Sequence, residues 1–209
     1  MARIADSPPP PPAELPVLDA FPRERADALR NRLKVLDAAE RLFACHGVDK
    51  VSMDAIAAEA GVGKGTLFRR FGDRAGLARA LLEEHERALQ ERLIRGPAPF
   101  GPGAPPRDRL KAMASAVYAQ LESHAALIAA GDAGAPGARF RTPPYAFYRL
   151  HTTLLIAEAD PSLDRELTAD MLLGALSAGA FLFWRQEHGF EIPRIQAAFD
   201  ELVDRLLPA

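Results

Sequence analysis

The stretch MDAIAAEAGVGKGTLFRRF (residues 53–71) joins two short helical patterns through a glycine-containing turn, and it restricts the fold more than any other feature. Residues 53–60 are rich in alanine, a strong helix former, and lack the β-branched run of a buried strand. Ser52 can cap this helix, because its hydroxyl accepts an unpaired backbone N–H. Gly61 allows a sharp turn that a side chain would hinder. The stretch therefore predicts a helix-turn-helix whose second helix begins at Lys64.

The letters GVGKGT also resemble part of the phosphate-binding loop of nucleotide enzymes. That loop has a glycine five residues before its Gly-Lys pair, and Ser or Thr directly after the lysine. The corresponding positions here are Ala58 and Gly65. The loop must also follow a buried strand, whereas residues 53–60 have a helical composition. The nucleotide-binding interpretation is therefore disfavoured.

The second helix concentrates positive charge on a chain that is slightly acidic as a whole. Between Ala60 and Gly72 stand Lys64, Arg69 and Arg70 and no acidic residue, while the formal net charge of the chain is −2. A local basic surface of this kind is what DNA binding requires. The alternative is an ordinary solvated basic helix, but such helices usually interleave acidic residues. The pattern favours a DNA-binding helix.

The rest of the chain has helical spacing of apolar residues and no period-two alternation typical of strands. We expect an all-α fold with about nine helices, including one long helix over residues 163–188. The expected domains are a disordered proline-rich arm over 1–26, a helix-turn-helix DNA-binding domain over 27–72, and a helical regulatory and dimerisation domain over 73–209. The arm is expected to be a solvated tail, although a polyproline ligand for a partner domain is an alternative.

Composition also indicates a cytoplasmic protein without a membrane segment. The longest apolar run, residues 171–184, is shorter than the ~18 residues that indicate a membrane span. The N-terminus lacks the apolar centre of a secretory signal. Cys45 is the single cysteine, which excludes an internal disulfide and a cysteine-rich metal site. We expect Cys45 to be a buried, small apolar side chain.

The segment RLKVLDAAERLFACHGVDKVSMDAIAAEAGVGKGTLFRRFGDRAGLARALL (residues 32–82) resembles the DNA-binding domain of TetR-family transcriptional regulators. The resemblance implies an N-terminal three-helix DNA-binding domain followed by a larger helical domain for ligand binding and dimerisation. It also implies that Lys64 and Thr66 contact DNA and that Ser52 contacts a phosphate. This chain has Gly63, Phe68, Arg70 and Arg74 where the family commonly has Ser, Tyr, His and Lys. The expected DNA-binding residues are Ser52, Gly63, Lys64, Gly65, Thr66, Phe68, Arg69, Arg70 and Arg74.

The C-terminal part is expected to hold an effector pocket and a dimer interface. The middle helices carry the aromatic segment RFRTPPYAFYRLH, and aromatic and apolar side chains are typical of ligand pockets. The candidate pocket residues are Met113, Val117, Leu121, His124, Phe140, Tyr145, Tyr148, His151, Leu155 and Leu176. Small residues on one helix face would allow another helix to approach closely, with intrachain core as the alternative. The candidate interface residues are Gly174, Ala175, Ala178, Gly179, Leu182, Phe199 and Leu202.

The expected function is a repressor that binds a palindromic DNA operator as a homodimer. The resemblance implies that a small apolar or aromatic effector moves the fourth helix and so releases DNA. The alternative is a TetR-like regulator controlled by a protein partner, or one without an effector. An enzyme is not expected, because the sequence has no HExxH, GxSxG or complete phosphate loop. No Cys/His cluster has metal-ligand spacing, and no cofactor is expected.

Overall fold

The computed structural model describes residues 23–47, 50–132 and 137–207, and all regular structure in these ranges is helical. The all-α prediction is confirmed, with nine α-helices and one short 3-10 helix in the described residues. The elements are α1 Arg23–His46, α2 Met53–Ala60, α3 Lys64–Phe71, α4 Arg74–Arg95, α5 Pro106–Asp132, η2 Arg139–Arg141, α6 Pro143–Ala159, α7 Arg165–Ala175, α8 Ala178–Gln186 and α9 Ile192–Leu206.

The helix-turn-helix forms from local signals in the chain. The Ser52 hydroxyl accepts a hydrogen bond from the Ala55 N–H at 3.1 Å, which caps α2. Gly61 ends α2 in the left-handed conformation, with φ +64°, and its N–H donates to α2 carbonyls. After the turn, the Gly63 carbonyl accepts from the N–H groups of Thr66 and Leu67 and starts α3. Two eight-residue helices are therefore held at a fixed angle.

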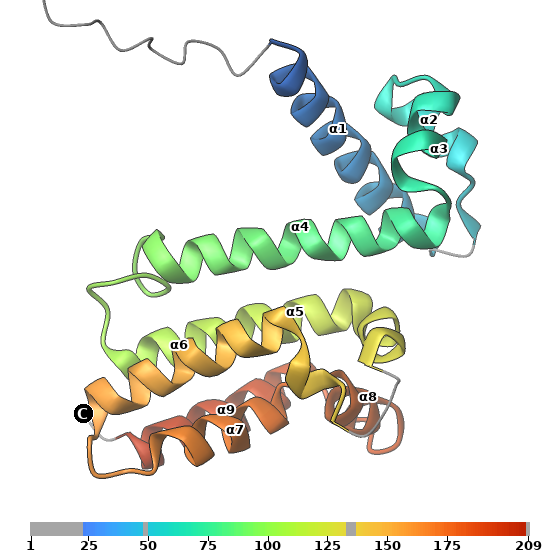
Figure 1. The fold of residues 1–209 in the computed structure, drawn as a ribbon. Helices are drawn as coiled ribbons and strands as arrows, with labels where there is room; N and C mark the ends of the chain where they lie inside the picture. Colours follow the sequence, from blue (N-terminus) through green and yellow to red (C-terminus); the bar gives the residue numbers. More distant parts are fainter. Residues whose placement is uncertain (1–22, 48–49, 133–136, 208–209) are drawn as a thin grey trace, which may run out of the picture.

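The described residues form two separate apolar cores. The N-terminal core packs α1, α2, α3 and the start of α4 and consists of Val35, Leu36, Ala39, Phe43, Val51, Met53, Ile56, Ala57, Leu67, Phe71, Leu77, Ala78, Ala80 and Leu81. The second core, named the regulatory core after the regulatory domain expected from the sequence, begins at Leu89 and Leu93 of α4 and continues through buried side chains of α5 to α9. Figure 1 shows α4 lying between the two groups of helices. Because α4 contributes to both cores, it is the mechanical link between them.

The prediction of one long helix over residues 163–188 is wrong, because the structure has two helices there, α7 and α8. The chain breaks between α7 and α8 at Ser177, whose hydroxyl oxygen accepts from the Ala180 N–H at 3.2 Å. The same hydroxyl donates to the Gly174 carbonyl at 2.9 Å. Serine competes in this way with the regular helical hydrogen bonds, so it ends one helix and caps the next. No single helix in the described ranges is long and apolar enough to cross a membrane; only the bent pair α7 and α8 reaches that threshold together.

Two further expectations change at the N-terminal end. α1 begins at Arg23, so the helix starts inside the arm expected over residues 1–26, while residues 1–22 lie outside the described part of the chain. Cys45 is exposed, and its expected burial is wrong. The reason is its position on α1: Ala39 and Phe43 face the N-terminal core, and a residue two positions after Phe43 points away from that face.

Candidate nucleic-acid interface and regulatory pocket

The helix α3 has one face buried in the N-terminal core and the other displayed to solvent. Leu67 and Phe71 are buried, with exposed fractions of 1% and 8%. The other expected contact residues on this helix are exposed, and they are Lys64, Gly65, Thr66, Phe68, Arg69 and Arg70. A helix anchored along one side and cationic along the other has the build of a recognition helix.

The ammonium group of Lys64 has an acidic neighbour on α2. Its Nζ lies 2.6 Å from Asp54 Oδ2, and both side chains are about 60% exposed, at 62% and 60%. The same Nζ lies 6.0 Å from the centre of the Phe68 ring. An exposed ion pair contributes little stability, so an incoming phosphate can replace the Asp54 carboxylate as the partner of Lys64.

Arg70 makes a contact that the sequence did not indicate. Its Nη1 donates to the backbone carbonyl of Ala28 on α1, at 2.8 Å. The guanidinium of Arg70 therefore ties α3 to the first turns of α1, whereas the sequence reasoning placed it among the DNA contacts. Arg69, its neighbour, is exposed. Only tertiary structure brings residues 28 and 70 together, so no local pattern could have revealed this bond.

The remaining expected DNA-binding residues border α3. Ser52 is exposed at the N-terminus of α2, where unpaired N–H groups favour an anion. Gly63 supplies no side-chain cap to α3, so the first N–H groups of that helix are not occupied by a hydroxyl. Arg74 is half-buried at the start of α4. In the chain, Ser52 stands directly before the helix-turn-helix, Gly63 in its turn, and Arg74 shortly after α3.

A cavity of about 900 Å³ lies between α4, α5, the start of α6 and the α7–α8 junction. Five residues named from the sequence line it, namely Val117, Leu121, Tyr145, Tyr148 and Leu176. The sequence reasoning missed the wall on α4, which consists of Arg79, Leu82, Glu83, Glu86, Arg87 and Gln90. These positions recur every three or four residues and therefore share one face of α4. That spacing is the signal from which the wall could have been found.

The other expected pocket residues do not line this cavity. Met113 and Leu155 are buried in the regulatory core, and Phe140 is exposed, at 59%. The His124 ring packs beside His85, with 5.5 Å between ring centres, and burial together with the His85 charge lowers the pKa of His124. Burial and the nearby charge of Arg109 lower the pKa of His151 to about 4. Both histidines are therefore neutral at neutral pH.

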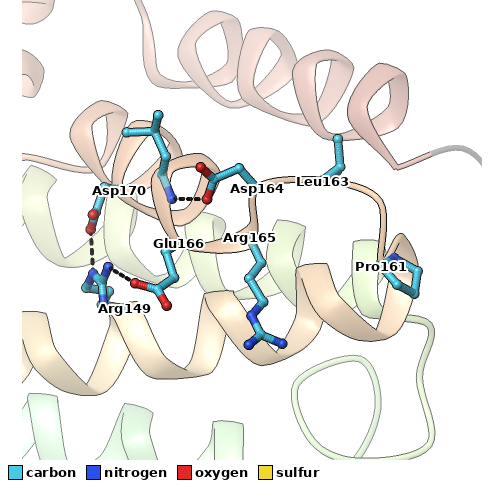
Figure 2. A pocket seen from close by; sticks show the side chains of 8 residues that line it. Arg149, Pro161, Leu163, Asp164, Arg165, Glu166 and Asp170 are labelled. Carbon is cyan, nitrogen blue, oxygen red and sulfur yellow. Dashed lines mark hydrogen bonds and ion pairs between the residues drawn. The ribbon is translucent and has the colours of Figure 1, made fainter.

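Figure 2 shows a second, polar pocket of about 500 Å³ at the surface where α7 begins beside α6. The Arg149 guanidinium donates to Asp170 at 2.9 Å and to Glu166 at 3.1 Å, and these bonds fasten α6 to α7. The Asp164 carboxylate accepts from the Leu167 N–H and caps α7. Arg149, Glu166, Asp170 and Asp164 therefore have structural partners within the chain. No group of three or more His, Cys, Asp or Glu side chains in the described ranges is arranged to hold a metal ion.

The expected dimer residues fall into two groups. Ala178 and Phe199 have exposed fractions of 2% and 4% and belong to the regulatory core of the same chain, so they cannot form the surface of an interface. The small side chain of Ala178 packs within the chain, in agreement with the alternative interpretation of intrachain core. Gly174, Gly179 and Leu202 are exposed, while Ala175 and Leu182 are half-buried.

Residues 35–81, which contain the helix-turn-helix, match the model of the bacterial regulatory proteins of the tetR family. The match covers the helix-turn-helix and the parts of α1 and α4 that flank it. One relative, the HTH-type transcriptional regulator SAB2452 of Staphylococcus aureus (strain bovine RF122 / ET3-1), is 45% identical over 53 residues. These residues are 25% of this chain and 29% of the relative, so the chain matches less than a third of the length of its curated relatives. The curated relatives are named HTH-type transcriptional regulators.

Solved structures share the fold of this chain over most of its length. A TetR-family regulator from Rhodococcus sp. covers 86% of this chain and 99% of its own, with 20% identity and a TM-score of 0.59. The transcriptional regulator FadR from Bacillus subtilis, solved in complex with stearoyl-CoA, covers 84% of this chain and 97% of its own, with 17% identity and a TM-score of 0.55. At these identities the likeness is one of fold: an N-terminal helix-turn-helix followed by a helical domain.

Proposed function

We propose that this chain is a DNA-binding transcriptional regulator in which α3 is the recognition helix. The observation that carries the proposal is the build of α3, with Leu67 and Phe71 buried and Lys64 and Arg69 exposed. An α-helix fits the major groove of B-form DNA, where side chains reach the edges of the bases. Lys64 then exchanges its ion pair with Asp54 for a phosphate or a base. The relatives that match this segment are named transcriptional regulators, which supports the proposal.

We further propose that the regulator binds DNA as a homodimer in the cytoplasm. One helix-turn-helix reads too few base pairs to select a site in a genome, whereas a two-fold dimer reads two half-sites about one helical turn apart, ~34–36 Å. The proposed interface uses the exposed small residues Gly174 and Gly179 together with Leu202, which is 49% exposed on α9. Met171 and Phe183 extend this surface, because they are 68% and 53% exposed on the same two-helix segment.

The cavity supports control by a small apolar or aromatic effector. Its volume of about 900 Å³ lies within the range of ligand pockets, and most of its lining residues are apolar or aromatic. One wall belongs to α4, which also contributes Leu77 and Leu81 to the N-terminal core. A ligand that favours another position of α4 therefore moves the recognition helices and releases DNA, which makes the protein a repressor. Control by a protein partner, the alternative, would require no such cavity.

The proposed function is tested by the salt dependence of DNA binding. Each phosphate contact releases bound counterions, so affinity should fall steeply as salt concentration rises. With six to ten phosphate contacts per dimer, we expect an affinity loss of about 10³–10⁵ between 50 and 200 mM salt. The measurement is fluorescence anisotropy of a labelled duplex from the region upstream of the gene, titrated at several salt concentrations. A salt-independent affinity, or none for DNA, would contradict the proposal.

A further inference from the structure

A carboxylate without a cationic partner lies in the wall of the cavity. Glu86 on α4 lines the cavity and is half-buried. Its Oε2 accepts from the Tyr148 hydroxyl at 3.1 Å, and its Oε1 accepts from Gln90 Nε2 at 2.8 Å. Both donors are neutral. Among the described residues, no lysine or arginine forms an ion pair with Glu86, although buried carboxylates are usually paired with a cation.

The surroundings of Glu86 make its negative charge costly in the empty cavity. Burial raises the pKa of Glu86, and its two hydrogen bonds, from Gln90 and Tyr148, only partly oppose this. Burial and the Glu86 carboxylate also raise the pKa of Tyr148, so its hydroxyl keeps its proton and remains a donor. A ligand cation beside Glu86 would supply the missing opposite charge in a region of low polarity, where charge pairing is strong.

The other charged residues of the lining have different surroundings. Arg79, Glu83 and Arg87 are exposed, and Arg87 Nη1 donates to Glu84 at 2.7 Å. Arg139 Nη2 donates to the Leu173 carbonyl at 3.0 Å, and its guanidinium stands over the Tyr145 ring, 5.3 Å from the ring centre. None of these arginines is among the groups that shift the pKa of Glu86.

The remaining wall is suited to an apolar body attached to that cation. It is formed by Leu82, Val117, Leu121, Ile128, Leu173 and Leu176. The Tyr145 and Tyr148 rings add aromatic surface, and aromatic faces attract cations as well as apolar groups. A cationic ligand with a large apolar or aromatic body would thus contact both kinds of surface.

We propose that the effector is an organic cation with an apolar or aromatic body, and that Glu86 is the residue that pairs with its positive charge. This inference rests on the proposed function of the cavity as the effector pocket. It names the chemical class of the effector and the residue that selects it. A neutral or anionic molecule of the same shape would bind less tightly, because it leaves the Glu86 charge unpaired.

The test uses two probes of nearly the same shape and opposite charge, tetraphenylphosphonium and tetraphenylborate. Isothermal titration calorimetry with the full chain measures the affinity for each. We expect the wild type to bind the phosphonium at least about tenfold more tightly than the borate. The Glu86→Gln variant should lose about tenfold in affinity for the phosphonium and none for the borate. Glu91→Gln is the matched control, because it removes the same charge from an exposed position on α4 outside the cavity lining, where Glu91 pairs with Arg95. It should leave the ratio of the two affinities within about twofold.

Several outcomes would overturn the inference. These are equal or stronger binding of the borate, binding of neither probe by the wild type, and an equal effect of both variants. If the Glu86→Gln variant does not fold, a measurement on the wild type alone still tests the inference. The phosphonium affinity of the wild type should fall as the pH is lowered and Glu86 becomes protonated. DNA affinity without probe should be the same for wild type and Glu86→Gln. Loss of DNA binding by the wild type would contradict the proposed function and leave the probe preference as a separate result.

Discussion

Replacement of Leu67 by alanine is expected to unfold the N-terminal domain and so abolish DNA binding. Leu67 is 1% exposed and packs in the N-terminal core from the middle of the recognition helix. Removal of a buried leucine side chain costs about 2–5 kcal/mol through lost burial and the cavity left behind. Thermal unfolding followed by circular dichroism measures the effect. Because the regulatory core is separate, its helices should remain folded at temperatures where α1 to α3 have melted.

The matched control makes the same chemical change at an exposed position. Leu29 on α1 is 53% exposed, so Leu29→Ala should change the free energy of unfolding by less than about 0.5 kcal/mol. Equal effects of the two substitutions would contradict the assignment of Leu67 to the core. A single transition in which all helices melt together would show that the two cores do not unfold independently.

The double variant Lys64→Ala/Arg69→Ala is expected to lose most of its DNA affinity without losing structure. Both side chains are exposed on α3, so their removal costs the fold little. Each lost contact to DNA costs about 1–3 kcal/mol, so the affinity should fall by about 30-fold to 10⁴-fold for each α3 that contacts DNA. If both contacts are to phosphates, the slope of log affinity against log salt should fall by about two per α3. Fluorescence anisotropy at several salt concentrations measures both quantities.

Two controls separate a contact with DNA from a general effect of charge. Asp54→Asn removes the carboxylate that holds Lys64, so it should strengthen DNA binding, because Lys64 no longer exchanges partners. Arg205→Ala removes a positive charge from α9, where Arg205 pairs with Glu201, and should leave DNA affinity unchanged. Normal DNA binding by the Lys64/Arg69 variant would show that α3 is not the recognition helix.

The helix-turn-helix could be predicted to the residue because its signals are local. The capping hydroxyl of Ser52 and the left-handed Gly61 lie beside the helix ends that they determine. The break at Ser177 could not be predicted in the same way, because the apolar residues on both sides continue one helical pattern. The hydrogen bond that the Ser177 hydroxyl accepts at the start of α8 is what marks the break. A pattern of apolar residues indicates that a helix forms, whereas its ends depend on single hydrogen bonds.

The site was predicted less completely than the fold, because it is assembled from distant segments. The bond between Arg70 and Ala28 joins residues 42 positions apart, and the pocket wall on α4 meets residues of α5 to α8. Tyr145 and Tyr148, which aromatic composition indicates, line the cavity. It could not separate them from Phe140, which is exposed, since all three lie in one aromatic segment. Their positions are set by tertiary packing, on which local composition carries no information.

Binding-site selection tests most directly whether α3 binds DNA twice in one symmetric dimer. The full-length protein is incubated with a library of random duplexes, and the bound molecules are recovered, amplified and sequenced over several rounds. We expect enrichment of an inverted repeat whose half-sites lie one helical turn apart, ~10 base pairs. Absence of any enriched sequence, or enrichment of a single unpaired half-site, would contradict it.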